Sequence, residues 1–100
     1  MALQIIWTPD AIHHFNEILE YWIECNGSPA YSQKLYQTVK STLLLLTKYP
    51  ESGKLTEKQG IRAKIVKDYY IFYSYNFSTL TIVGMCDMRR DPVLLETYLK

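Results

Sequence analysis

The sequence predicts an α+β fold in which a helical hairpin packs on one face of a small, mainly antiparallel sheet. Three observations predict it: a short β-prone segment at the start, two long segments with apolar residues at helical spacing, and three closely spaced segments of strand character. The expected order is strand, helix, helix and three strands, followed by a short C-terminal helix or tail. With 100 residues, 48% of them hydrophobic, the chain suffices for one core, so we expect a single domain over residues 1–100.

The first strand is expected at residues 3–7 (LQIIW), directly before Thr8-Pro9-Asp10. The hydroxyl of Thr8 can accept a hydrogen bond from a backbone N–H that has no partner within a helix, and Pro9 lacks such an N–H. A helix therefore begins here, and Asn26-Gly27 ends it. Its apolar residues recur at helical spacing: Ile12, Phe15, Leu19, Trp22 and Ile23.

Ser28-Pro29 repeats this start signal for a second helix, which Pro50 ends. Because only residues 26–28 separate the two helices, they should form an antiparallel hairpin. One face of the second helix carries Tyr31, Leu35, Val39, Leu43 and Leu46. The leucine run at 43–46 widens this face. Either the helix is clamped between its partner helix and the sheet, or an apolar groove is left open for another protein.

The second half of the chain changes from helical spacing to strand spacing. Residues 50–60 are polar and should form a loop, and strands are expected at 61–66, 69–75 and 80–86. The short turns between these strands predict an antiparallel meander, with the first strand of the chain joining the same sheet. Residues 92–100 are compatible with one or two helical turns.

The formal net charge is only +1, so the chain has no overall basic field that would attract nucleic acid. Positive charge is concentrated in one short span, which holds Lys54, Lys58, Arg62, Lys64 and Lys67.

Arg62 and Lys64 should share one face of their strand, because strand side chains alternate. If the helices cover the other face, with Ile61, Ala63 and Ile65, the two cations line the open face of the sheet. Cations beside the aromatic residues of the next strand suit single-stranded nucleic acid. The same pattern is typical of an ordinary solvated strand, so both interpretations stay open.

The sequence lacks the familiar catalytic and metal-binding motifs. His13 and His14 are adjacent and therefore point to different sides of their helix, while Cys25 and Cys86 have no metal-ligand spacing. No metal and no cofactor is therefore expected. The chain start does not resemble a signal peptide, and no segment has the roughly 18 apolar residues that a membrane span needs. We expect a cytoplasmic protein without membrane association.

Six segments together carry a family likeness. In chain order they are W-T-P-x-A (7–11), L-x-Y-W (19–22), L-x-x-x-P-x-x-G (46–53), I-R-x-x-x-V (61–66), D-Y-x-I-F-Y (68–73) and R-R-D-P (89–92). In this order and at this length they resemble the RelE/ParE toxin superfamily over nearly the whole chain.

The resemblance implies the toxin of a bacterial type II toxin-antitoxin module. Such a toxin is neutralised in a hetero-oligomer by a protein antitoxin encoded beside it. RelE-like members cut mRNA in the ribosome, whereas ParE-like members inhibit DNA gyrase. For an RNA-cleaving toxin, the resemblance gives Arg62, Lys64 and Arg89 as catalytic residues, and we add Tyr70, which would substitute in part for an arginine that RelE-like enzymes carry at its position. The cations would offset the charge that develops at phosphorus, with the RNA 2′-hydroxyl as nucleophile. Arg89 and Arg90 should point in opposite directions, and we assign Arg89 to the site.

Two departures favour a ParE-like toxin over an RNA-cleaving one. Tyr70 stands where RelE-like enzymes carry an arginine, and their C-terminal tyrosine has no clear counterpart here. A third hypothesis is a non-toxic antitoxin-binding module that retains only the fold. In each case the apolar face of the second helix is the expected dock for an amphipathic antitoxin segment. This dock would consist of Leu35, Val39, Leu43 and Leu46.

Overall fold

The computed structural model describes residues 3–88 and contains two helices and a five-stranded sheet. In chain order the elements are β1 (Gln4–Trp7), α1 (Pro9–Asn26), α2 (Ala30–Lys48), the 3-10 helix η1 (Pro50–Ser52), β2 (Lys54–Leu55), β3 (Arg62–Val66), β4 (Tyr69–Tyr75) and β5 (Thr79–Asp87). The predicted α+β class and the order of helices and strands are confirmed. The predicted C-terminal helix or tail lies outside the described residues.

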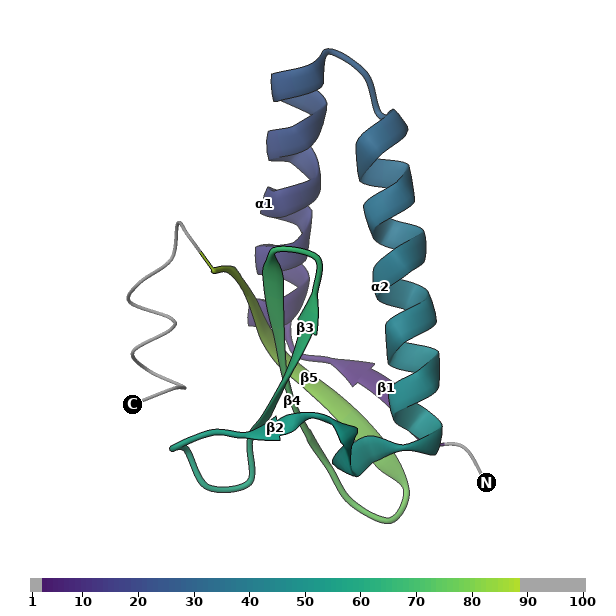
Figure 1. Cartoon of the computed structure of the whole chain (residues 1–100), viewed down its shortest axis with the longest axis vertical. Coiled ribbons are helices and arrows are strands. Elements are labelled where there is room, and N and C mark those ends of the chain that lie inside the picture. Colours follow the sequence, from purple (N-terminus) through teal and green to yellow (C-terminus); the bar gives the residue numbers. More distant parts are fainter. Residues whose placement is uncertain (1–2, 89–100) are drawn as a thin grey trace.

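The strands are arranged in the order β1-β5-β4-β3-β2. β1 lies parallel to β5 at one edge, whereas β5, β4, β3 and β2 pair antiparallel. The two helices form a hairpin that rises beyond the sheet, with α1 and α2 side by side (Figure 1). Neither helix combines the length and the apolar composition that crossing a membrane requires.

Local capping sets the helix ends close to the predicted positions. The Thr8 hydroxyl accepts a hydrogen bond from the N–H of Ala11 at 3.1 Å, and α1 starts at Pro9. Gly27 ends α1 with a left-handed conformation, φ 63°, and its N–H donates to the carbonyl of Ile23. The second helix starts at Ala30, one residue later than predicted, and the N–H of Ala30 donates to the Ser28 hydroxyl.

The segment predicted as a loop, residues 50–60, contains η1 and the short strand β2. Lys54 lies opposite Ala63 and Leu55 lies opposite Arg62, so β2 exists because β3 offers it a partner. A two-residue strand shows no alternation in its own sequence, and the prediction of a plain loop was therefore wrong for these residues.

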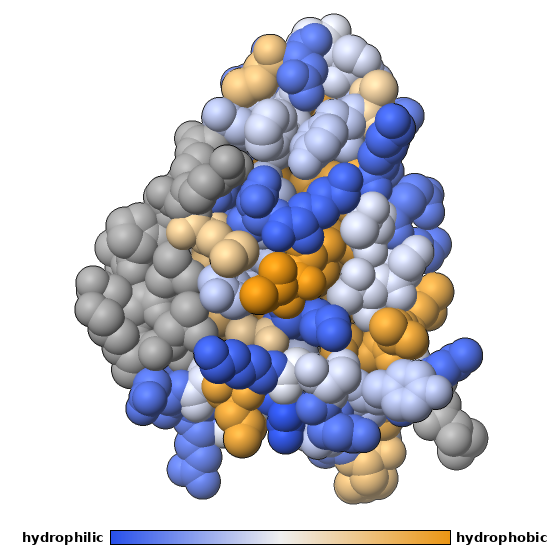
Figure 2. Space-filling view, in the orientation of Figure 1, coloured by the Kyte–Doolittle hydropathy of each residue, from blue (hydrophilic) through white to orange (hydrophobic). Residues whose placement is uncertain are grey.

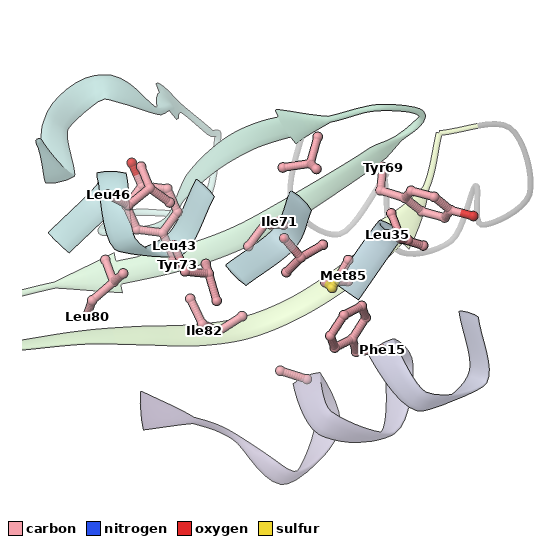
Figure 3. Close-up of a cluster of buried hydrophobic side chains, with 13 residues drawn as sticks. Phe15, Leu35, Leu43, Leu46, Tyr69, Ile71, Tyr73, Leu80, Ile82 and Met85 are labelled. Atoms are coloured by element: carbon pink, nitrogen blue, oxygen red, sulfur yellow. The ribbon is translucent and has the colours of Figure 1, made fainter. Parts of the chain in front are cut away.

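The main hydrophobic core fills the space between the helices and the sheet. Its side chains come from all the larger elements, and Figure 3 shows most of them facing one another across this space. The buried members are Ala11, Phe15, Leu35, Val39, Leu43, Leu46, Val66, Tyr69, Ile71, Tyr73, Leu80, Ile82 and Met85. The apolar stripes predicted for the helices thus form the core, and Leu35, Val39, Leu43 and Leu46 are each at most 3% exposed.

Strand β3 is oriented opposite to the arrangement that would put its cations on the open face. Arg62, Lys64 and Val66 lie on the helix side, because their β4 partners Tyr73, Ile71 and Tyr69 belong to the main core. Ala63 and Ile65 lie on the other side. Val66, next to the β3–β4 turn, packs into the core. Because side chains alternate along a strand, Lys64 and Arg62 therefore lie on the same, helix-facing side as Val66. The expectation that these cations line the open face was wrong.

The face of the sheet opposite the helices carries a second, smaller apolar cluster. Ala63, Phe72 and Cys86 are buried there, and Ile61, Tyr70 and Val83 pack against them. This face is therefore not a plain solvated surface.

Candidate functional site

Arg62 holds the segment after α2 against the sheet. One guanidinium nitrogen, Nη1, donates to the carbonyl oxygens of Glu51 at 3.0 Å and Gly53 at 2.8 Å. The guanidinium carbon also lies 5.9 Å from the centre of the Tyr75 ring. The positive charge of Arg62 is thus engaged by backbone carbonyls and an aromatic ring of its own chain.

Tyr73 lies opposite Arg62 on β4 and contacts the same segment. Its hydroxyl accepts a hydrogen bond from the N–H of Gly53 at 2.9 Å and donates one to the carbonyl of Pro50 at 2.6 Å. Burial raises the pKa of Tyr73, although the Gly53 N–H and the Arg62 charge oppose this shift. The hydroxyl therefore stays protonated well above neutral pH. It fixes the turn in which the P-x-x-G segment, Pro50 to Gly53, leaves the helix.

The structure separates the residues proposed for RNA cleavage. Arg62 and Lys64 are half-buried on the helix side of β3. Tyr70 lies on the opposite face of the sheet, where its ring stacks on Phe72 at a centroid distance of 5.8 Å. Arg89 lies outside the described residues. Among residues 3–88, the structure thus brings two of the predicted cations onto one face and places the tyrosine on the other.

Two other segments of the family likeness meet at the far end of the hairpin. The indole N–H of Trp22, from L-x-Y-W, donates to the hydroxyl of Tyr69, from D-Y-x-I-F-Y, at 2.5 Å. Trp22 packs against Tyr31, and the Lys67 ammonium lies 5.4 Å from the centre of the Tyr31 ring. These contacts attach the β3–β4 turn to both helices, so this pair of segments has a structural role.

Two hollows that share Tyr36 lie on the surface between α1 and α2, and the second of them is also lined by β1. The hollow near the hairpin turn has a volume of about 250 Å³ and is lined by Leu19, Ile23, Pro29, Ser32, Gln33, Tyr36 and Gln37. The hollow near β1 has a volume of about 270 Å³ and is lined by Ile5, Trp7, Phe15, Tyr36, Val39, Lys40, Leu43 and Leu44. We call these two hollows together the helical groove.

Stacked aromatic rings build the wall of the helical groove near β1. Trp7 and Phe15 stack at 5.5 Å between ring centres, and Phe15 stacks on Tyr36 at 6.0 Å. This ladder joins β1, α1 and α2. Its outer ring, Tyr36, is 45% exposed, and Leu44, about two turns further along α2, is 54% exposed. The groove therefore exposes apolar side chains to solvent beside this aromatic ladder.

The residues predicted to bind the antitoxin are much less exposed than Tyr36 and Leu44. Leu35, Val39, Leu43 and Leu46 are core residues that pack on the sheet. Sequence reasoning missed Tyr36 and Leu44, although the leucine run at 43–46 hinted that α2 is apolar on more than its buried stripe. Figure 2 shows one face of the molecule, on which apolar patches are separated by hydrophilic residues and one patch lies over the C-terminal half of α2.

Among residues 3–88, no three His, Cys, Asp or Glu side chains come together in a way that could hold a metal ion. Two candidate sites remain. One is the corner in which Arg62 and Tyr73 bind residues 50–53, and the other is the helical groove. Of these two sites within residues 3–88, the helical groove is the one that has apolar hollows open to solvent.

Comparisons with known proteins point to one family. The model of a family described as "ParE toxin of type II toxin-antitoxin system, parDE" matches residues 5–92. A solved structure described as the chromosomal ParDE TA system from P. aeruginosa is similar in fold, with a TM-score of 0.75. The two chains share 16% sequence identity over 86% of this chain and 96% of the other. A comparison with curated proteins gave no match.

Proposed function

This chain belongs to the ParE toxin family of type II toxin-antitoxin systems, and we propose that it inhibits DNA gyrase and is neutralised by an antitoxin bound in its helical groove. The hydrogen bonds of Arg62 are the observation that favours gyrase over mRNA as the target. A guanidinium that stabilises charge on a scissile phosphate must be aimed at the substrate. Arg62 is instead bound by the carbonyls of Glu51 and Gly53.

The alternative function is ribosome-dependent cleavage of mRNA. It would need Arg62, Lys64, Arg89 and Tyr70 to act on one phosphate. The position of Tyr70, across the sheet from Arg62 and stacked on Phe72, argues against this combination and supports gyrase as the target. General acid-base catalysis needs a group within hydrogen-bonding reach of the proton it transfers.

Expression of the toxin without its antitoxin tests the target. A gyrase inhibitor should cause DNA damage and filamentous cells while bulk translation continues, and the purified protein should inhibit DNA supercoiling by gyrase. Prompt translation arrest with cleaved mRNA, abolished by Arg62→Ala, would instead establish the nuclease. Normal growth at the same protein level would indicate a module that keeps the fold and has lost toxicity.

The helical groove is proposed as the antitoxin dock because of its length and its chemistry. From Ser32 to Leu44, the α2 residues that line it span 12 residue-to-residue steps, or about 18 Å of helix. This is about three helical turns, which suits an amphipathic helix with apolar residues on one side. An antitoxin segment that is disordered alone would fold as it binds there.

Paired substitutions test the groove. Leu44→Asp places a charge on its apolar wall and should weaken binding of the adjoining gene's protein product at least tenfold. Leu55→Asp is a matched control, because Leu55 is 64% exposed on β2, at the sheet edge remote from the groove. Both variants should fold, since both side chains are exposed in the isolated chain. Equal affinity of the two variants for this partner would overturn the groove as the dock.

A further inference from the structure

The two helices that form the groove carry opposite charges. The charged residues of α1 are all acidic: Asp10, Glu17, Glu20 and Glu24. The charged residues of α2 are all basic: Lys34, Lys40 and Lys48. The helix on one side of the groove therefore carries acidic side chains, and the helix on the other side carries basic ones.

Lys40 is the one charged residue among those that line the helical groove. It lies one turn after Tyr36 and one turn before Leu44 on α2, so all three residues share one side of the helix. Lys40 is exposed, and within residues 3–88 its ammonium has no carboxylate partner. Lys40 thus presents an uncommitted cation between two exposed apolar side chains.

We propose that Lys40 selects the antitoxin by pairing with a carboxylate on the docking segment. This inference rests on the groove being the antitoxin dock. The two hollows flank Tyr36, and a helix laid along them would place apolar residues into both, about two turns apart. The carboxylate would lie on the flank of that helix that faces α2, beside the apolar residue that enters the hollow near β1.

The acidic side of the groove adds a directional constraint. Glu20 lies one turn before Ile23, which lines the hollow near the hairpin turn, so Glu20 borders the groove on the α1 side. Turning the docking helix end to end would bring its acidic flank next to Glu20. Like charges would then face each other, and Lys40 would lose its partner. The charge difference between α1 and α2 therefore selects the direction of the bound helix as well as its sequence.

Charge reversal in the purified protein tests the proposal. Lys40→Glu should weaken binding of the adjoining gene's protein product at least tenfold, measured by titration calorimetry. Lys34→Glu makes the same change in net charge on the same helix, away from the groove lining, and should change affinity less than twofold. The wild-type affinity should fall as salt is raised, whereas the affinity of Lys40→Glu should fall much less. Replacing one partner carboxylate by lysine should restore tight binding to Lys40→Glu alone.

The same series separates this inference from the groove itself. If Leu44→Asp loses binding while Lys40→Glu binds like wild type, the groove is the dock and the role of Lys40 is overturned. Equal weakening by Lys40→Glu and Lys34→Glu would also overturn it, since only overall charge would matter. If Leu44→Asp binds like wild type, the groove and the role of Lys40 both fail.

Discussion

The backbone N–H of Gly53 donates a hydrogen bond to the buried hydroxyl of Tyr73 at 2.9 Å, across 20 residues of sequence. The same hydroxyl donates to the carbonyl of Pro50, and Arg62 binds the carbonyl of Gly53 from the neighbouring strand. The chain leaving α2 is thereby fixed on the sheet by strands β3 and β4. Stability of the fold should depend strongly on this corner.

Gly53→Ala should destabilise the protein by about 1–3 kcal/mol, because overpacking forces neighbouring atoms to move. A Cβ atom at this position would lie 2.3 Å from the Tyr73 hydroxyl oxygen. The backbone of Gly53 has φ −77°, so missing space rather than backbone conformation excludes a larger residue. Denaturant unfolding measures the effect, and the exposed neighbour Ser52→Ala should stay within about 0.5 kcal/mol of wild type. Equal stability of both variants would contradict this prediction.

Tyr73→Phe should cost about 1–3 kcal/mol at pH 7, because it leaves the Gly53 N–H and the Pro50 carbonyl without their partner. Burial raises the pKa of Tyr73 above its usual 10.0, so the folded state favours the protonated hydroxyl. The stabilisation is present below pH 10 and is lost as the pH rises through the raised pKa. The stability difference between wild type and Tyr73→Phe should therefore shrink above pH 10. A difference that stays constant up to pH 11.5 would contradict the raised pKa.

Trp22 and Tyr69 should be coupled energetically through the hydrogen bond between the indole N–H and the tyrosine hydroxyl. A double-mutant cycle with Trp22→Phe and Tyr69→Phe should give a coupling free energy of about 0.5–1.5 kcal/mol. As a control, Trp22→Phe combined with Tyr75→Phe should be additive within about 0.5 kcal/mol, because Tyr75 lies at the other end of β4. Additivity in both cycles would mean that the hydrogen bond contributes nothing to stability.

Thr8→Ala should destabilise the protein by about 1 kcal/mol, because the N–H of Ala11 loses its acceptor at the start of α1. The Thr8 hydroxyl also lies 3.4 Å from the carbonyl of Val83, to which it donates, and this contact would be lost too. Thr8→Ser keeps the hydroxyl and should remain within about 0.5 kcal/mol of wild type. Thermal or denaturant unfolding distinguishes the two; a serine variant as unstable as the alanine variant would rule out the cap as the cause.

Local signals predicted the elements of this fold well. Thr8 and Gly27 bound α1 because capping depends on residues within one turn, and a run of aromatic and β-prone residues between two turns located β4 at residues 69–75. The likeness to ParE-like toxins, which rested on six short segments, is confirmed by the family match. The strand β2 was missed because it exists only through its pairing with β3. The two residues Lys54 and Leu55 carry no strand signal of their own.

The candidate site was less predictable than the fold. Alternation shows that Arg62 and Lys64 share a face, but the packing of Val66 into the core decides which face that is. Likewise, helical spacing identifies the apolar stripe of α2, but the residues of that stripe are buried in the core and are not free to bind a partner. The side chains left for a partner, Tyr36 and Leu44, become recognisable only once α1 and β1 lie beside them.

The parallel pairing of β1 with β5 has a consequence for synthesis of the toxin. Gln4 pairs with Thr79 and Trp7 with Ile82, so the first strand to be made finds its partner in the last strand of the described chain. Until β5 has been synthesised, β1 has no strand to pair with, and Trp7 is not held in place at its end of the aromatic ladder. Closing so long a loop also makes folding slower than local pairing would. A nascent chain therefore cannot complete this sheet until residues 79–82 of β5 have been synthesised, however early β1 and the two helices are made.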